Sequence, residues 1–184
     1  VTWTSKFRSP RMAKYFIVVL AFLLVSINIE GSIIPYSRKI KSNGQTALSR
    51  EFLDPQNTIR AELGLPPLAW DSHLARYARH YANIRRGDCA LQHSNGPFGE
   101  NIFWGSGYSW SPEQAAALWI SEQQYYDLSS NSCVDGKQCG HYTQIVWRDT
   151  RRVGCARVIC DNNLGVFMTC NYDPPGNYIG QTPY

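Results

Sequence analysis

The sequence lacks several patterns that mark common functional classes. It has no cysteine pair spaced as CxxC and no HExxH pair, so neither a zinc-finger nor a zinc-protease signature is present. Internal repeats and low-complexity tracts are absent, and no Asn-x-Ser/Thr sequon predicts N-glycosylation. The apolar run at residues 15–27 is shorter than the roughly 20 residues that a membrane-spanning helix needs. These absences argue against a repeat array, a zinc finger and a membrane-spanning helix at this run.

The amino-terminal part has the pattern of a secretory signal. Residues 1–11 are polar and precede the first methionine, and we interpret them as an upstream, non-native segment. A lysine and the apolar run follow Met12, which is the arrangement of a signal peptide over residues 12–31. Residues 32–51 are polar and basic and are interpreted as a flexible lead-in. One domain over residues 52–184 is then expected.

The formal charge of +4 is misleading because much of it lies in the segments expected to be removed. From residue 32 onward, 14 basic residues face 13 acidic ones, which leaves a net charge of +1. A nucleic-acid-binding protein is expected to carry a strong basic excess. The sequence therefore predicts no nucleic-acid partner.

Helix signals dominate the first half of the expected domain. Asp54 is suited to cap a helix that begins at Pro55 and ends at Gly64. A second helix is expected to begin near Asp71, and a third at Ser111 with a capping-box pattern. The second helix carries an apolar stripe at three- and four-residue steps, formed by Leu74, Tyr77, Ala78, Tyr81 and Ala82.

Strand signals follow later in the chain. Residues 153–159 and 166–170 predict two strands joined by a turn at 161–165, and residues 102–104 predict a short earlier strand. Residues 141–147 are apolar and β-branched, so either state fits them. Helices first and a strand pair late indicate an α+β fold.

Cysteines are the strongest compositional signal of the expected domain. All six follow the signal segment, at Cys89, Cys133, Cys139, Cys155, Cys160 and Cys170. An even number of cysteines behind a signal peptide predicts disulfides rather than free thiols.

The predicted hairpin of residues 153–170 reduces the number of possible disulfide pairings. If its centre lies between Asn162 and Asn163, Cys155 faces Cys170 directly, within reach of a disulfide. A register shifted by one residue would change the partner of Cys170. With the first register, the other bridges are Cys133–Cys139, closing a short loop, and Cys89–Cys160.

Two stretches carry a family resemblance. Residues 140–150 read GHYTQIVWRDT, and residues 167–178 read FMTCNYDPPGNY. Both resemble the signature motifs of the CAP superfamily (cysteine-rich secretory proteins, antigen 5, pathogenesis-related 1), in the expected order. Further agreement comes from residues 81–89, 99–102 and 118–122. The resemblance covers about residues 52–184 and favours the plant pathogenesis-related protein 1 group.

The resemblance implies a more specific architecture than the pattern alone. It implies an α-β-α sandwich, with helices on both faces of a small antiparallel sheet, and it favours the same disulfide pairing. One departure is Gln56-Asn57, where relatives often have His-Asn.

Four residues match the cleft tetrad of the family. By resemblance these are His93, Glu100, Glu122 and His141, a donor set that suits a divalent metal such as zinc. No cofactor is required by the sequence, and the spacing alone leaves solvated carboxylates and hydrogen-bonded histidines as the alternative. A metal-dependent hydrolase is the alternative function, but no nucleophile stands in a recognisable setting, so a non-enzymatic protein is expected.

The segment 123–130 reads QQYYDLSS and resembles the loop associated with sterol binding in the superfamily. Tyr125, Tyr126 and Asp127 are the candidate sterol-binding residues, because tyrosine rings supply apolar faces with a polar rim. Ordinary half-buried tyrosines are the structural alternative. The implied action is antifungal, by withdrawal of a sterol or related lipid from a microbial membrane.

The last residues, 174–184, resemble a family segment that is cut after an aspartate and released as an immune signalling peptide. Asp173 and Pro174 would flank the cut, and a receptor for the peptide is implied. The alternative role for the segment is to close the edge of the fold with Tyr178 and Ile179. These expectations together describe a monomeric, secreted plant defence protein of the extracellular space, the apoplast.

Overall fold

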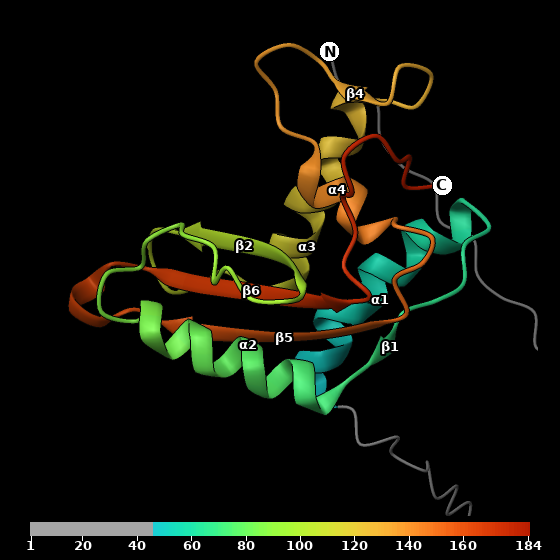
Figure 1. Ribbon diagram of the computed structural model, residues 1–184. Helices are drawn as coiled ribbons and strands as arrows, with labels where there is room; N and C mark the ends of the chain where they lie inside the picture. Colours follow the sequence, from blue (N-terminus) through green and yellow to red (C-terminus); the bar gives the residue numbers. More distant parts are fainter. Residues whose placement is uncertain (1–45) are drawn as a thin grey trace, which may run out of the picture. The chain divides into compact units, whose positions relative to one another are not determined.

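The computed structural model describes residues 46–184 (Figure 1). The segments expected at 1–11 and 12–31 lie outside the described residues. Within the described part, no helix combines the length and apolarity that a membrane crossing requires.

A four-stranded sheet in the order β1–β5–β6–β2 forms the middle layer (Figure 1). β5 (Arg152–Ile159) and β6 (Val166–Asp173) are the predicted hairpin. β2 (Gly99–Gly105) lies antiparallel on the other side of β6, while the short β1 (Ala69–Trp70) runs parallel to β5. Cys155 is opposite Cys170, so the predicted hairpin register is confirmed.

Helices cover both faces of the sheet. α2 (Ser72–Arg85) packs on β5 and β6 from one side, as Figure 1 shows. On the other side, the main core joins residues of α1 (Ala47–Glu62), α3 (Pro112–Ser121) and α4 (Gly140–Ile145) to the sheet. The α+β class and the α-β-α sandwich are therefore confirmed.

Short elements complete the fold. η1 (Glu122–Tyr125) extends α3, and η2 (Asp161–Asn163) lies in the hairpin turn. β3 (Tyr126–Asp127) and β4 (Ser132–Cys133) form a separate two-stranded ribbon. The segment whose state the pattern left open is helical at α4 and irregular after Ile145.

The first helix begins earlier than predicted. α1 starts at Ala47, where the side chain of Thr46 accepts a hydrogen bond from the Ser49 backbone N–H at 3.2 Å. Pro55 therefore lies inside the helix, and Asp54 is not its cap. Burial of Phe52 and nearby side chains stabilises the turns before the proline and offsets the hydrogen bond that the proline removes. The expected lead-in, 32–51, thus already contains helical residues from position 47.

The predicted end of α1 is confirmed. Gly64 has φ +67°, its N–H bonds to the Ala61 carbonyl, and the Leu65 N–H bonds to the Arg60 carbonyl. This pattern is the Schellman motif, which a glycine in the left-handed region stabilises.

The predicted starts of α2 and α3 are also confirmed. The Asp71 carboxylate accepts hydrogen bonds from the His73 and Leu74 backbone N–H groups, and Ser111 with Gln114 forms a reciprocal capping box. The apolar stripe of α2 faces the sheet, where Gly154 permits close approach. A Cβ at this glycine would lie 2.1 Å from the Ala75 nitrogen.

The three predicted disulfides are present. Cys89–Cys160 joins the loop after α2 to the end of β5, Cys155–Cys170 crosses the hairpin, and Cys133–Cys139 closes a short loop.

Candidate functional site

The first candidate pair lies at the start of β2. His93 Nδ1 is 2.8 Å from Glu100 Oε1, and the same oxygen accepts a hydrogen bond from the Ser94 N–H at 2.8 Å. The other carboxylate oxygen accepts from Asn171 Nδ2, on β6, at 3.2 Å. The Glu100 side chain is only 6% exposed, whereas that of His93 is 54% exposed. A buried, fully engaged carboxylate therefore holds an imidazole at the surface.

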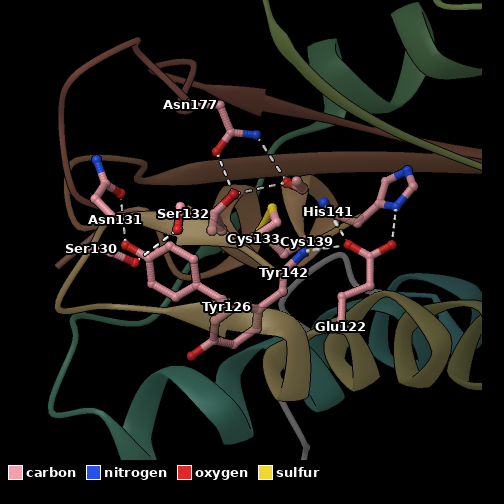
Figure 2. The surroundings of a disulfide bond; sticks show 12 residues. Glu122, Tyr126, Ser130, Asn131, Ser132, Cys133, Cys139, His141, Tyr142 and Asn177 are labelled. Carbon is pink, nitrogen blue, oxygen red and sulfur yellow. Dashed lines mark hydrogen bonds and ion pairs between the residues drawn. A yellow bond between two sulfur atoms is a disulfide. The ribbon is translucent and has the colours of Figure 1, made fainter. Parts of the chain in front are cut away.

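The second pair joins the end of α3 to the start of α4. His141 Nδ1 is 2.7 Å from Glu122 Oε1. The other oxygen of Glu122 accepts from the His141 backbone N–H at 2.9 Å, so the carboxylate also satisfies an N–H group at the first turn of α4. The Trp119 ring stacks on the imidazole with centroids 6.0 Å apart. Figure 2 shows Glu122 and His141 pointing toward each other beside the Cys133–Cys139 bridge.

Hydrogen bonds favour the ionised form of both carboxylates. Burial alone would raise the pKa of Glu100, but hydrogen bonds from His93 and Ser94 outweigh it and lower that pKa. The pKa of Glu122 is lowered in the same way, with burial opposed by hydrogen bonds from His141. The hydrogen bond to Glu100 raises the pKa of His93 against the opposing effect of burial.

Three of the four tetrad residues line one cavity of about 420 Å³, here called the histidine cavity. Its lining residues are His93, Glu100, Asn101, Cys133, Lys137, Gln138, Cys139, Gly140, His141 and Asn177. Glu122 is not among them, and it contacts the lining residue His141. In the described part of the chain, no three His, Cys, Asp or Glu side chains gather closely enough to form a ready-made metal cage. The tetrad is thus two pairs rather than four converging ligands.

The donor set nevertheless fits a histidine-bound metal. In both imidazoles Nδ1 is engaged with a carboxylate, which leaves Nε2 as the available ligand atom. A histidine that binds metal usually donates its other ring N–H to such a partner. The arrangement therefore suits His93 and His141 as metal ligands, with Glu100 and Glu122 orienting them. Metal binding itself stays a prediction.

A second cavity, of about 380 Å³, is also lined by the Cys133–Cys139 bridge and is here called the tyrosine cavity. It is lined by Tyr126, Asn131, Ser132, Cys133, Cys139, Gly140, Thr143, Trp147, Asn177, Tyr178, Ile179, Gly180, Gln181 and Pro183. Both bridged cysteines, Gly140 and Asn177 line both cavities, so the two cavities adjoin at the short disulfide loop.

The three candidate sterol residues have different positions. Tyr126 lines the tyrosine cavity, packs near Tyr142 with ring centroids 6.1 Å apart, and donates from its hydroxyl to Asn131 at 2.9 Å. Tyr125 lies outside the lining, with the Lys137 ammonium 5.2 Å from its ring centroid. Asp127 is exposed and accepts hydrogen bonds from the hydroxyls of the two serines that follow it after Leu128. Sterol binding by these residues stays a prediction.

Asp173 and Pro174 lie where β6 ends. The Asp173 carbonyl accepts from the Arg151 N–H at 3.1 Å, and its carboxylate pairs with Arg152. Asp173 is half-buried and Pro174 is exposed, and the bond between them is cis.

Several supporting residues were missed from the sequence. Asn101 donates to the His141 carbonyl at 3.0 Å, Asn171 holds Glu100, and Lys137 enters the histidine cavity. The asparagines belong to strands, where the alternation of side chains predicts which face of the sheet a residue lies on but not its hydrogen-bond partner. No local sequence signal identifies them, although both lie within or beside stretches that resemble the family.

The fold and the site define a class of protein: a three-disulfide α-β-α sandwich with histidine–glutamate pairs beside a small cavity. The model of the cysteine-rich secretory protein family, CAP, matches residues 53–172. Pathogenesis-related protein PR-1 of Medicago truncatula is 54% identical over 169 residues, which cover 92% of this chain and 94% of that protein. Pathogenesis-related protein 1A of Nicotiana tabacum is 48% identical over 164 residues, covering 89% and 94%.

Solved structures agree with this fold. The crystal structure of NaASP2 with Zn²⁺ has a TM-score of 0.61 and 26% identity, covering 78% of this chain and 88% of that one. The chain belongs to the CAP family, in the plant pathogenesis-related protein 1 group. Its plant relatives are named for a role in defence, and not as enzymes.

Proposed function

We propose that this protein is a secreted plant defence protein that binds a sterol or a related lipid in the tyrosine cavity. The observation that carries the proposal is the position of Tyr126, the one candidate sterol residue that lines this cavity. The lining combines the aromatic side chains of Trp147 and Tyr178 with polar groups such as Asn131, a composition typical of small-molecule pockets. A cavity of about 380 Å³ lies within the usual range for such pockets.

Tyr126→Ala is expected to weaken binding of a fluorescent sterol at least about tenfold, because it removes an aromatic wall worth more than about 1.4 kcal/mol. Tyr125→Ala is the matched control, since the adjacent ring lies outside the cavity lining, and it should bind like the parent. Equilibrium titration of the oxidised protein measures both. Equal losses in the two variants, or no saturable binding by the parent, would contradict the assignment.

A second part of the proposal concerns the last residues. Segment 174–184 acts as a latent signalling peptide that an extracellular endopeptidase frees by cutting after Asp173. The exposed Pro174 beside the half-buried Asp173 places the bond at the surface. A plant receptor for the free peptide is the implied partner.

The histidine cavity is proposed to hold a divalent metal through Nε2 of His93 and His141. Such an ion would be held by the two imidazoles and would supply a positive charge at the cavity, while Glu100 and Glu122 would orient the imidazoles. A related structure, NaASP2, is described with Zn²⁺, which supports zinc as the first metal to test.

Zinc titration by calorimetry is expected to show one site that His93→Ala or His141→Ala abolishes. Glu100→Gln should weaken affinity about 10–100-fold, because the orienting carboxylate is lost. Affinity should fall as pH drops, since protonated imidazole cannot bind metal. Because the pKa of His93 is raised, the fall should begin above about pH 6.5. His80→Ala, at an exposed position of α2, is the control. If this variant loses as much zinc affinity as the His93 and His141 variants, the site lies elsewhere.

Hydrolysis is the weaker candidate function. No serine, threonine or free cysteine lines the histidine cavity, whose two cysteines form a disulfide. That lining therefore offers no hydroxyl or free thiol as a nucleophile, and a metal-dependent hydrolase would have to use metal-bound water instead. The names of the plant relatives also give no enzymatic activity. The proposed action is non-enzymatic, and zinc-dependent turnover of a peptide library by the purified protein would overturn it.

A further inference from the structure

The segment 174–184 is bound to the rest of the domain along its length. At its start, the Pro174 carbonyl accepts from the Thr150 hydroxyl at 2.9 Å, and the Gly176 N–H donates to Gln144 Oε1 at 3.0 Å. Gly176 also lies so close to Trp147 that an added Cβ would be 2.7 Å from its ring. The first turn of the segment is therefore fitted to α4 and the loop that follows it.

The middle of the segment is fixed by Asn177. Its Oδ1 accepts from the Thr143 hydroxyl at 2.7 Å, and its Nδ2 donates to the Gly140 carbonyl at 2.9 Å. Figure 2 shows this side chain pointing toward α4 from the irregular segment that follows β6. Its φ of +59° is one that asparagine tolerates better than most residues. One side chain, which lines both cavities, thus makes two hydrogen bonds to α4.

The end of the segment is fixed as well. The Pro183 carbonyl accepts from the Arg148 N–H at 2.6 Å, and Pro183 is buried. The Tyr184 hydroxyl is 3.0 Å from that of Tyr142, a buried residue of α4. Hydrogen bonds at the start, the middle and the end of the segment therefore oppose its dissociation from either end.

All of these partners come from residues 140–150, and none depends on the bond between Asp173 and Pro174. We propose that the domain is a binding groove for its own segment 174–184, which stays bound without a covalent link after that bond is cut. The inference rests on the proposed peptide function. Cutting and release are then separate steps, and dissociation from the groove decides when the peptide becomes free.

The cut itself does not drive the pieces apart. Hydrolysis by an endopeptidase adds one water, giving a carboxylate at Asp173 and a protonated secondary amine at Pro174. The new carboxylate forms next to the Arg151 N–H and the Arg152 guanidinium, which already contact Asp173. The new amine forms at an exposed residue. The carboxylate at the half-buried Asp173 has donors beside it and the amine is exposed, so neither new charge is left buried without a partner, and hydrolysis is expected to leave the groove contacts intact.

The test uses the full chain with a recognition site for a sequence-specific protease, flanked by glycine and serine, inserted between Asp173 and Pro174. Unchanged circular dichroism of the uncut protein shows that it folds. After cutting, the peptide is expected to co-elute with the domain in size exclusion and to appear as a one-to-one complex in native mass spectrometry. A peptide that elutes alone as soon as the chain is cut would overturn the proposal.

Two variants locate the groove. Asn177→Ala should speed dissociation by about tenfold, because losing its two hydrogen bonds costs about 1.4 kcal/mol. Thr182→Ala is the control in the same segment, since Thr182 is exposed and lines neither cavity. Equal dissociation rates for both would overturn the assigned groove.

If the insertion prevents folding, hydrogen exchange on the parent gives the answer. The Gly176 amide must then be protected as strongly as the sheet, and exchange as fast as in the free peptide would overturn the proposal. A synthetic peptide 174–184 applied to leaf tissue separates the two hypotheses. If that peptide gives no defence response, the precursor function fails whatever the nicked protein retains. If it is active but leaves the nicked protein at once, only retention fails.

Discussion

Replacing Arg60 by methionine is expected to lower the free energy of unfolding by about 3–5 kcal/mol. Arg60 is fully buried in α1, and its guanidinium donates only to backbone carbonyls. These acceptors are Pro66, Ile145, Trp147 and Thr150, at 2.8, 2.9, 2.8 and 3.2 Å. Methionine keeps most of the volume but leaves these carbonyls without their donor in the interior, which is costly.

The charge of Arg60 has no carboxylate partner among these contacts. Burial, and then the nearby charge of Arg151, lower its pKa to about 10, so the guanidinium stays protonated at neutral pH. Its planar fork serves several carbonyls at once, which a lysine ammonium cannot do. Arg60→Lys is therefore expected to recover only a small part of the loss.

Urea unfolding followed by tryptophan fluorescence measures the effect. Arg79→Ala is the control, because Arg79 is exposed on α2 and its loss should change stability by less than about 0.5 kcal/mol. Equal unfolding midpoints for Arg60→Met and Arg79→Ala would contradict this prediction. The hydrogen bonds from Arg60 to the four carbonyls would then contribute little to stability. Because Arg60 holds the loop that contacts segment 174–184, the methionine variant should also loosen that segment.

Local signals predicted local structure well. Asp71 and Ser111 cap helices as expected, because a capping side chain contacts N–H groups only two or three residues away. The alternation of the hairpin strands, together with its turn, placed Cys155 opposite Cys170. The three disulfide pairs follow from this register, since the hairpin pair and the short loop leave a single remaining combination.

Tertiary contacts explain what the pattern missed. The start of α1 was misplaced because a proline at position 55 looks like a first helical residue, while the packing of Phe52 that supports the earlier turns is not local. The role of Arg60 has no local sequence signal, because its acceptors lie up to 90 positions away. Neither feature has a sequence period that would identify it.

The candidate site was also predicted only in part from the sequence. The resemblance supplied His93, Glu100, Glu122 and His141, and the fold places them as two bonded pairs. The resemblance could not show that Nδ1 of each imidazole contacts a glutamate carboxylate. It also could not show that Glu122 is absent from the lining of the histidine cavity. These details decide which atoms remain for a metal, and they depend on how α3, α4 and β2 pack together.

Removing the disulfide between Cys89 and Cys160 by paired alanine substitutions is expected to lower the free energy of unfolding by about 4 kcal/mol. Its cysteines are 71 residues apart, so the bond restricts a long loop in the unfolded chain. The bond between Cys133 and Cys139 spans only 6 residues, and removing it should cost about 2 kcal/mol. Guanidinium unfolding of the two double variants, without reductant, measures the difference. Equal costs would show that native contacts, and not loop length, set the contribution of each bridge.

The two double variants should rank oppositely in function. The Cys133–Cys139 bridge lines both cavities, together with Asn177 of segment 174–184, although it is expected to contribute less to stability. The Cys89–Cys160 bridge lies in neither lining. Below the unfolding transition, the variant without the short-loop bridge is therefore expected to lose affinity for both sterol and zinc, while the less stable variant keeps them. Sterol fluorescence and zinc calorimetry on both proteins check this. If affinity instead followed stability, the cavities would depend on the whole fold rather than on the loop that separates them.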